Sequence, residues 1–316
     1  MKTHRLTLCR FAAALGLFTL SSTTTLAQPP ALEVTTSFSI LGDLVRQVGG
    51  DKVNVRTLVG TDEDAHAFQP RPSDARAIGA SALVVVNGLG FDDWMTRLAR
   101  SGGFKGQIVV ASAGINTLAM VDGDDHGHDS HAYQHGHAHA ADPHAWQDLG
   151  NAQRYVANIA AALALTDPTH ADTYRANAER YNGELKALDS EIRAAFAALP
   201  SERRKVVSSH DAFAYFGQAY GIRFLSPVGV SNNAEPTAKD VASLIRQLKT
   251  EEIPAVFIEN VVEPRLIERI RSESGTRVGG TLYSDALSAA GGPAPDYLSM
   301  MRSNFKTLHE ALRPAP

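Results

Sequence analysis

The 316-residue chain contains a single cysteine, Cys9, which lies among the first ten residues. The rest of the chain therefore has neither a disulfide framework nor a thiolate metal site, and any metal there must be held by nitrogen or oxygen. The sequence also lacks an apolar run of the roughly 20 residues that a membrane-spanning helix requires. Basic residues are not in excess, with 30 Lys and Arg against 34 Asp and Glu, so no nucleic-acid partner is predicted.

Residues 1–27 have the pattern of a secretory signal peptide. Three basic residues precede the short apolar run "FAAALGLFTL", and small residues at the −3 and −1 positions place a cleavage site after Ala27. Cys9 precedes the apolar run, so it does not occupy the place of a lipid-bearing cysteine, which follows such a run. We predict an exported protein whose mature form is free of cysteine.

Short β-rich runs alternate with helical patterns in two stretches of the chain. The first stretch contains "LEVTTSF", "KVNVRTLV", "ALVVVNG" and "QIVVAS", and the second contains "KVVSSH", "IRFLSPVGV", "AVFIEN" and "RVGGTLYS". This alternation indicates parallel βα units. We predict an α/β protein of two lobes, residues 28–165 and 201–316, each a mostly parallel sheet flanked by helices.

A long helix is predicted between the two lobes. From the capping pair Asp167 and Pro168, apolar residues recur at spacings of three and four until Pro200. The pattern predicts about 31 helical residues, or roughly 46 Å at 1.5 Å per residue. Residues 166–200 are therefore predicted to join the lobes as one rigid helix.

Residues 119–143 are rich in His, Asp, Gly and Ala, and seven of the twelve histidines of the chain fall within residues 126–146. The segment has too few apolar side chains to offset the entropy of ordering it, which predicts a disordered His-rich loop. A tight metal site needs ligands fixed by packed elements. The loop alone is therefore not predicted to be that site.

Four residues at the ends of predicted elements are candidate metal ligands: His66, His144, His210 and Asp285. The carboxyl ends of strands are where open α/β sheets bind ligands, and His144 is set apart from the loop histidines by the proline before it and the tryptophan after it. Each residue taken alone has an ordinary structural interpretation. Together, three imidazoles and one carboxylate are a set that tetrahedral Zn²⁺ accepts, without an open position for a reacting water.

Further acidic residues lie next to these candidates. Asp211 could orient the ring of His210, although a role at a helix start is favoured. Glu259, at the end of "AVFIEN", could approach the site as a further ligand or as support for one, although a structural role is favoured. The acidic run 62–64 before His66 is predicted to be solvated or to support neighbouring ligands, in preference to binding metal.

Four motifs, "DAHAFQPRPSD", "DPHAWQD", "SSHDAFAYF" and "LYSDALS", resemble in content and order those of the periplasmic solute-binding proteins of metal-specific ABC transporters, the cluster A-I family. The resemblance extends from Ser37 to the C-terminus. It implies two α/β lobes bridged by one long helix, with metal in the cleft between them. It also implies ligand roles for His66, His144, His210 and Asp285, and delivery to a membrane permease powered by a separate ATPase.

Within this family, the third ligand position separates zinc from manganese receptors. Manganese receptors usually carry a carboxylate there, whereas this chain has His210, and zinc receptors commonly carry a His-rich loop. Both features favour Zn²⁺, as does the preference of imidazole for that ion. A manganese or iron receptor remains the alternative, because some zinc receptors use water or another carboxylate in place of Asp285.

We therefore predict a monomeric periplasmic receptor that is not an enzyme, and the sequence leaves open whether a metal chaperone loads it. Two rivals belong to other classes. A zinc-dependent hydrolase would need a metal-bound water and a nearby general base, and the chain has no "HExxH" stretch. A metal buffer without a transporter is the second rival.

Overall fold

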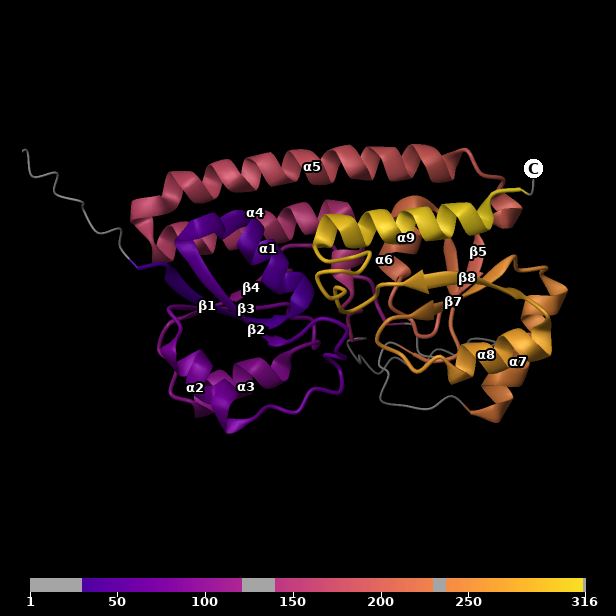
Figure 1. Cartoon of the computed structure of the whole chain (residues 1–316), viewed down its shortest axis with the longest axis horizontal. Coiled ribbons are helices and arrows are strands. Elements are labelled where there is room, and N and C mark those ends of the chain that lie inside the picture. Colours follow the sequence, from indigo (N-terminus) through magenta and orange to yellow (C-terminus); the bar gives the residue numbers. More distant parts are fainter. Residues whose placement is uncertain (1–29, 121–139, 230–236, 315–316) are drawn as a thin grey trace, which may run out of the picture. The chain divides into compact units, whose positions relative to one another are not determined.

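Two four-stranded parallel sheets form the centres of two lobes within residues 31–316 of this computed structural model, which describes residues 30–120, 140–229 and 237–314 (Figure 1). The first sheet has the order β2-β1-β3-β4 and the second β6-β5-β7-β8. Their strands are β1 (Leu32–Phe38), β2 (Val53–Val59), β3 (Leu83–Val86), β4 (Gln107–Val110), β5 (Lys205–Val207), β6 (Arg223–Leu225), β7 (Ala255–Glu259) and β8 (Arg277–Leu282). All eight predicted strands and the two-lobe α/β fold are confirmed.

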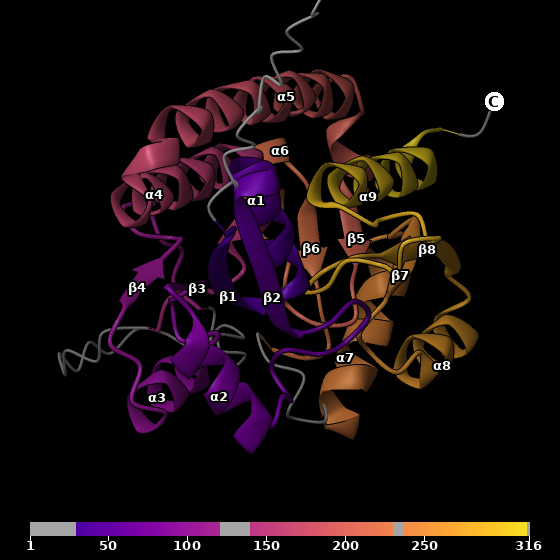
Figure 2. The same cartoon turned by 60° about the vertical axis from the view of Figure 1, so that its left-hand side comes forward.

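Helices cover both faces of each sheet (Figures 1 and 2). The upper side carries α1 (Ser39–Gly49) and α4 (Leu149–Thr166) in the first lobe, and α6 (Ala214–Tyr220) and α9 (Tyr297–Leu312) in the second. The lower side carries α2 (Pro72–Ala80), α3 (Asp93–Ser101), α7 (Ala238–Thr250) and α8 (Arg265–Ser274). This arrangement explains why the central strands are apolar on both faces.

The side chains of β3 show how the core divides into layers. Successive residues of a strand point to opposite faces. Val84 and Val86 pack with α2 and α3 in a small lower core, whereas Leu83 and Val85 belong to a larger upper core. The larger core contains residues of both lobes, so the lobes share one apolar interior above their sheets.

The long helix α5 (Ala171–Ala197) passes over both lobes (Figure 1). It has 27 residues, and at 1.5 Å per residue it is about 40 Å long. It is shorter than predicted at both ends. At the start, Asp167 does not cap the helix, because its carboxylate accepts a hydrogen bond from Tyr174 and lies 2.6 Å from the ring of His170, beside a 3₁₀ turn.

The predicted boundaries of the His-rich loop, 119–143, were too wide. Residues 121–139, which contain six of its histidines, lie outside the described residues. On either side of them the chain is folded, since the amide of Met120 donates to the carbonyl of Ala140 at 2.8 Å. Asp142 is 1% exposed. The flanking residues therefore belong to the first lobe, and they connect the His-rich segment directly to the candidate ligand that follows.

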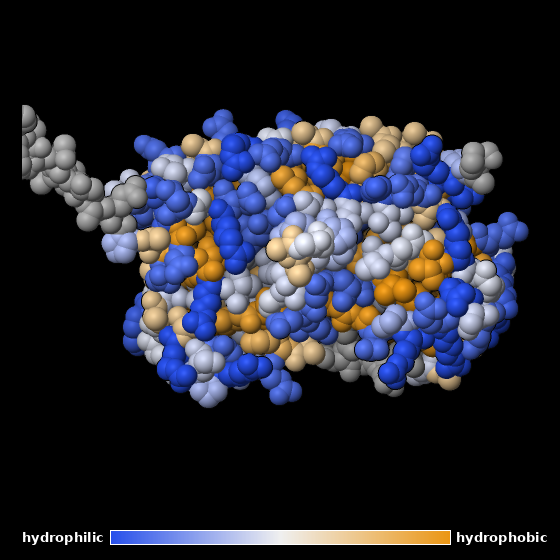
Figure 3. Space-filling view, in the orientation of Figure 1, coloured by the Kyte–Doolittle hydropathy of each residue, from blue (hydrophilic) through white to orange (hydrophobic). Residues whose placement is uncertain are grey.

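The helices of the described residues do not have the character of membrane spans. None of them is long and apolar enough to cross a membrane. On the face drawn in Figure 3, hydrophilic side chains cover most of the surface, and hydrophobic ones appear in separated patches.

Candidate metal centre

Loops from both lobes bring three imidazoles and one carboxylate together. His66 follows β2, His210 follows β5, Asp285 follows β8, and His144 begins the 3₁₀ turn that leads into α4. One possible ligand atom from each of the four residues lies within 4.8 Å of the other three. Within the described part of the chain this is the one such group of His, Cys, Asp or Glu, and it consists of the four residues singled out from the sequence.

The distances in this cluster suit a small four-coordinate cation. Nε2 of His66 lies 3.3 Å from Nε2 of His144 and 3.4 Å from Oδ2 of Asp285. Nε2 of His210 lies 3.2 Å from the same Oδ2, and Nε2 of His144 lies 3.5 Å from Oδ1. Ligand atoms of a tetrahedral ion with bonds of about 2.0–2.1 Å lie about 3.3–3.4 Å apart. These four separations bracket that value, and the four chosen ligand atoms all lie within 4.8 Å of one another.

The four side chains are almost completely removed from solvent. His144, His210 and Asp285 are 0% exposed, and the side chain of His66 is 8% exposed. Within the described residues, neither oxygen of Asp285 has a hydrogen-bond partner of good geometry, although three imidazole nitrogens lie within 3.5 Å of them. Buried polar atoms without a hydrogen bond need an explanation, and shared binding of one ion by these side chains would supply it.

The buried charges of the cluster are strongly coupled. Burial alone would raise the pKa of Asp285, but the His210 and His144 rings hold it well below its usual value. Burial would likewise lower the pKa of His210, but the carboxylates of Glu259 and Asp285 raise it well above its usual value. The site is therefore built for a positive charge, and a bound cation would displace a proton from His210.

His144 is held in place from its far side. Oδ1 of Asp142 lies 2.8 Å from Nδ1 of the ring and accepts a hydrogen bond from the His144 amide at 2.9 Å. The side chain of Asn87 donates to the carbonyl of Pro143, and the ring of Trp146 lies 5.3 Å from the imidazole. These contacts direct Nε2 toward the cluster. The sequence singled out Pro143 and Trp146 but placed Asp142 in a disordered loop.

His210 is held by Glu259. Oε1 of Glu259 accepts hydrogen bonds from the amides of Ser209 at 2.7 Å and His210 at 2.9 Å, and Oε2 lies 2.6 Å from Nδ1 of the His210 ring. The prediction that Asp211 stands at a helix start was wrong, because α6 begins at Ala214 and has no acidic residue in its first turn. Glu259 orients the imidazole from the neighbouring strand β7.

The loop that carries His66 is tied to the second lobe. The carboxylate of Asp64 accepts a hydrogen bond from the His66 amide at 2.8 Å. The carboxylate of Asp62 accepts a hydrogen bond from the side chain of Asn260 at 3.0 Å. The backbone amide of Asp62 donates to the carbonyl of Leu287 at 2.9 Å. Two members of the acidic run 62–64 therefore make specific bonds beside the site, as expected of groups that support a ligand.

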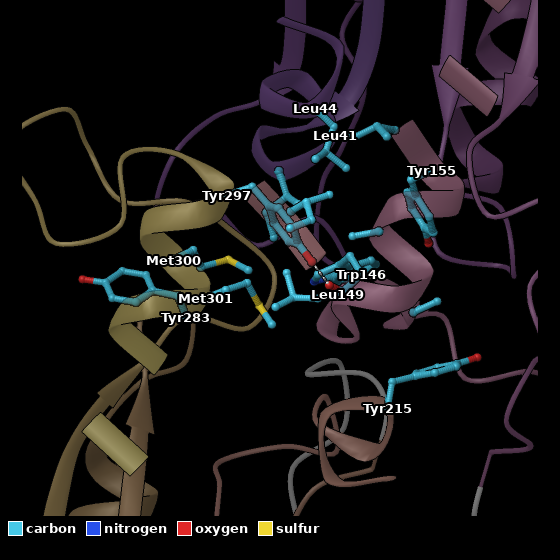
Figure 4. Packing of buried hydrophobic residues seen from close by; sticks show 14 of the residues in the cluster. Leu41, Leu44, Trp146, Leu149, Tyr155, Tyr215, Tyr283, Tyr297, Met300 and Met301 are labelled. Carbon is cyan, nitrogen blue, oxygen red and sulfur yellow. Dashed lines mark hydrogen bonds between the residues drawn. The ribbon is translucent and has the colours of Figure 1, made fainter. Parts of the chain in front are cut away.

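The segment around Asp285 is held from the first lobe. The indole of Trp146 donates to the carbonyl of Ser284 at 2.9 Å, and the side chain of Gln147 donates to the same oxygen at 2.7 Å. Figure 4 shows the hydroxyl of Tyr297 from α9 directed at the carbonyl of Trp146. The position of Asp285 therefore depends on contacts between the lobes.

We predict that Glu259→Gln weakens metal binding at this site by about 10- to 100-fold, the usual effect of losing a carboxylate that orients a metal-bound imidazole. The amide retains the size of the side chain but loses the charge that faces Nδ1 of His210. Affinity is measured by competition with a chromophoric chelator. Glu251→Gln is the matched control, because Glu251 pairs with Lys205 near the surface. Equal affinities for Glu259→Gln and the wild type would refute this role.

The loop after β3 contains a buried acid that makes stability depend on pH. Asp92 is 1% exposed and accepts hydrogen bonds from the amides of Asn87 at 2.6 Å and Gly88 at 3.0 Å. Burial raises its pKa from 3.8 to about 6. Because the folded value lies above the unfolded one, protonation of Asp92 favours the folded state. Its contribution is complete below about pH 4 and is lost as pH rises through about 6.

The expected size of that contribution is up to about 3 kcal/mol of unfolding free energy. Urea unfolding of metal-free protein at pH 4.5 and pH 7 measures it. The free-energy difference between the wild type and Asp92→Asn should favour the wild type more at the lower pH. A pH-independent difference for Asp92→Asn would contradict the assignment.

Comparison with known proteins identifies the family. Residues 34–311 match the family described as ZnuA, zinc-uptake complex component A, periplasmic. The chain is 32% identical over 281 residues to the manganese-binding lipoprotein MntA of Halalkalibacterium halodurans, covering 89% of this chain and 88% of the relative. It is 31% identical over 313 residues to the iron-binding protein YfeA of Yersinia pestis, covering 94% and 96%.

Solved structures of metal-binding proteins have the same fold as this chain. The periplasmic zinc-binding protein TroA of Treponema pallidum superposes with a TM-score of 0.81 at 26% identity, over 90% of this chain and all of the other. A manganese-bound periplasmic metal-binding protein of Candidatus Liberibacter asiaticus gives 0.78 at 26% identity, over 89% and 100%. The chain belongs to the ZnuA family, the cluster A-I metal-binding receptors of ABC transporters, as its four motifs indicated.

Proposed function

We propose that this receptor captures Zn²⁺ through His66, His144, His210 and Asp285 and delivers it to an ABC permease driven by a separate ATPase. The observation that carries the proposal is the buried cluster, in which neighbouring ligand atoms lie 3.2–3.5 Å apart. Four ligands from the protein fill a tetrahedral zinc site and leave no position for a reacting water. This supports a receptor over a zinc-dependent hydrolase.

The alternative is a manganese or iron receptor of the same family. MntA and YfeA are named for manganese and iron, and both are more than 30% identical to this chain. Three imidazole nitrogens favour zinc, because Mn²⁺ prefers oxygen ligands and higher coordination numbers. Zinc therefore fits the ligand atoms better, and the relatives make manganese the first competitor to test.

Native mass spectrometry tests the choice of metal. Metal-free protein lacking residues 121–139 is mixed with equal amounts of Zn²⁺, Mn²⁺ and Fe²⁺ under reducing, anaerobic conditions. The deletion removes six histidines that would bind extra zinc and obscure the stoichiometry. We expect one Zn²⁺ per chain, retained against the other two ions. Preferential retention of Mn²⁺ or Fe²⁺ would establish the alternative.

We propose that residues 1–27 are a signal peptide and that the mature receptor acts in the periplasm. The basic start, the short apolar run and the small residues before Gln28 support this assignment. N-terminal sequencing of the exported protein should begin at Gln28.

The His-rich segment has a separate proposed role, which is to raise the local supply of zinc beside His144. Several neighbouring histidines can bind zinc weakly and exchange it quickly. Deleting residues 121–139 should slow metal loading at scarce zinc while leaving the affinity of the one-to-one site unchanged. Loss of the tight site in the deletion variant would refute this division of roles.

A further inference from the structure

A tyrosine of the second lobe closes a hydrogen-bond bridge beside His144. Tyr215 lies in α6, five residues after His210, and is 2% exposed. Its hydroxyl accepts a hydrogen bond from the amide of Leu118 at 3.0 Å and donates one to the carbonyl of Asp142 at 3.0 Å. Both partners belong to the first lobe, and Figure 4 shows the Tyr215 side chain projecting away from α6.

The two partners of Tyr215 are also bonded to each other. The amide of Asp142 donates to the carbonyl of Leu118 at 2.9 Å, so the hydroxyl joins a pair of chain segments that already lie side by side. Asp142 in turn contacts both the ring and the amide of His144 at less than 3 Å. A shift of the Asp142 backbone would therefore move the carboxylate that orients His144.

The bridge connects two ligands that come from different lobes. The chain passes directly from His210 through Phe213 into α6, and Phe213 and Phe216 are 0% exposed, so Tyr215 and His210 are parts of one packed unit. The hydroxyl of Tyr215 reaches the segment that carries His144. Trp146 and Gln147 also bond to the second lobe, at Ser284 and Tyr297. Of the links described above, the one from Tyr215 ends on Asp142, the residue whose carboxylate faces the His144 ring.

We infer that Tyr215 is a positioning residue for the metal site, whose hydroxyl sets the place of His144 relative to His210 through the carboxylate of Asp142. The inference rests on the proposed metal-ligand role of those two histidines. Removing only the hydroxyl leaves the buried ring, and with it the packing, in place. The amide of Leu118 and the carbonyl of Asp142 would then each lose a partner, and Asp142 would be less firmly held.

The test is Tyr215→Phe, with Tyr220→Phe as the matched control. Tyr220 lies on the same helix and is 4% exposed, but its hydroxyl donates to Asp189 of α5, away from the metal site. Tyr215→Phe should lower zinc affinity by about tenfold, the lower end of the effect of losing outer support for a ligand. Tyr220→Phe should leave zinc affinity unchanged, even if both variants melt at lower temperatures.

A spectroscopic measurement separates positioning from general loss of stability. Co²⁺ in the zinc site has visible absorption bands whose intensity depends on the arrangement of the ligands. At saturating Co²⁺, these bands should change in Tyr215→Phe and not in Tyr220→Phe. Wild-type bands and affinity in Tyr215→Phe would overturn the inference, as would equal losses of affinity in both variants.

A double-mutant cycle tests the route through Asp142. Asp142→Asn should weaken zinc binding, and adding Tyr215→Phe to it should cost less than the tyrosine change costs alone, because both changes act on the same ring. Strictly additive effects would overturn the proposed route. If the wild type binds no metal tightly, the proposed function fails. The His144 ring signals in the NMR spectrum of metal-free Tyr215→Phe would then still decide whether the hydroxyl positions that ring.

Discussion

Asp285→Asn should reduce zinc affinity by at least about a thousandfold, which corresponds to about 4 kcal/mol of binding free energy. Asp285 is the one carboxylate among the four proposed ligands, and its two oxygens lie within 3.5 Å of three imidazole nitrogens. The amide has nearly the same size, so the cluster stays filled. It carries no charge, so the doubly charged ion would lose the one anionic ligand among the four.

The effect should fall on binding and not on folding. A neutral amide at this buried position leaves no unpaired negative charge, so the metal-free variant should retain its secondary structure by circular dichroism. Competition with a chromophoric chelator measures the affinity, and Asp172→Asn, at an exposed position on α5, is the control for a generic change of charge. A variant with wild-type zinc affinity would remove Asp285 from the site.

The sequence predicted the strands and the candidate ligands because both depend on local pattern. Each strand is a short apolar run bounded by turn residues. His66, His210 and Asp285 are polar residues that shortly follow such runs. In parallel sheets the carboxyl ends of all strands meet at one edge, so residues far apart in sequence become neighbours without any further signal. The lobes could therefore be predicted, as could the residues that meet between them.

The residues that orient the ligands could not be predicted in this way, because their partners are remote in sequence or wrongly assigned. Glu259 lies 49 residues from His210, and nothing near it in the sequence specifies that ring as its partner. Asp142 stands in a polar run whose composition predicts disorder, and contacts with Leu118, Tyr215 and His144 hold it in place. The error at Asp211 is one of a helix boundary, since α6 begins at Ala214, three residues after Asp211.

Zinc should raise the unfolding temperature of both lobes together. The proposed ligands come from two lobes, so unfolding of either lobe destroys the site. At free zinc a thousandfold above the dissociation constant, binding to the folded state alone contributes about 4 kcal/mol. For a protein of this size, that shifts the melting temperature by on the order of 10 °C. If the metal were bound by residues of one lobe only, that lobe alone would gain this stability.

The two tryptophans of the chain make the lobes distinguishable. Trp94 and Trp146 both lie in the first lobe. Tryptophan fluorescence follows that lobe and, through the bond of Trp146 to Ser284, its contact with the second, whereas far-ultraviolet circular dichroism follows both lobes. With zinc, both signals should change at one temperature, well above that of chelator-treated protein. The experiment uses protein lacking residues 121–139, because histidines that bind zinc in the unfolded chain would reduce the shift. Asp285→Asn should show almost no zinc-dependent shift. A zinc-dependent rise of the fluorescence transition, with part of the circular dichroism change left at the temperature of chelator-treated protein, would mean that the metal binds the first lobe alone, without His210 and Asp285.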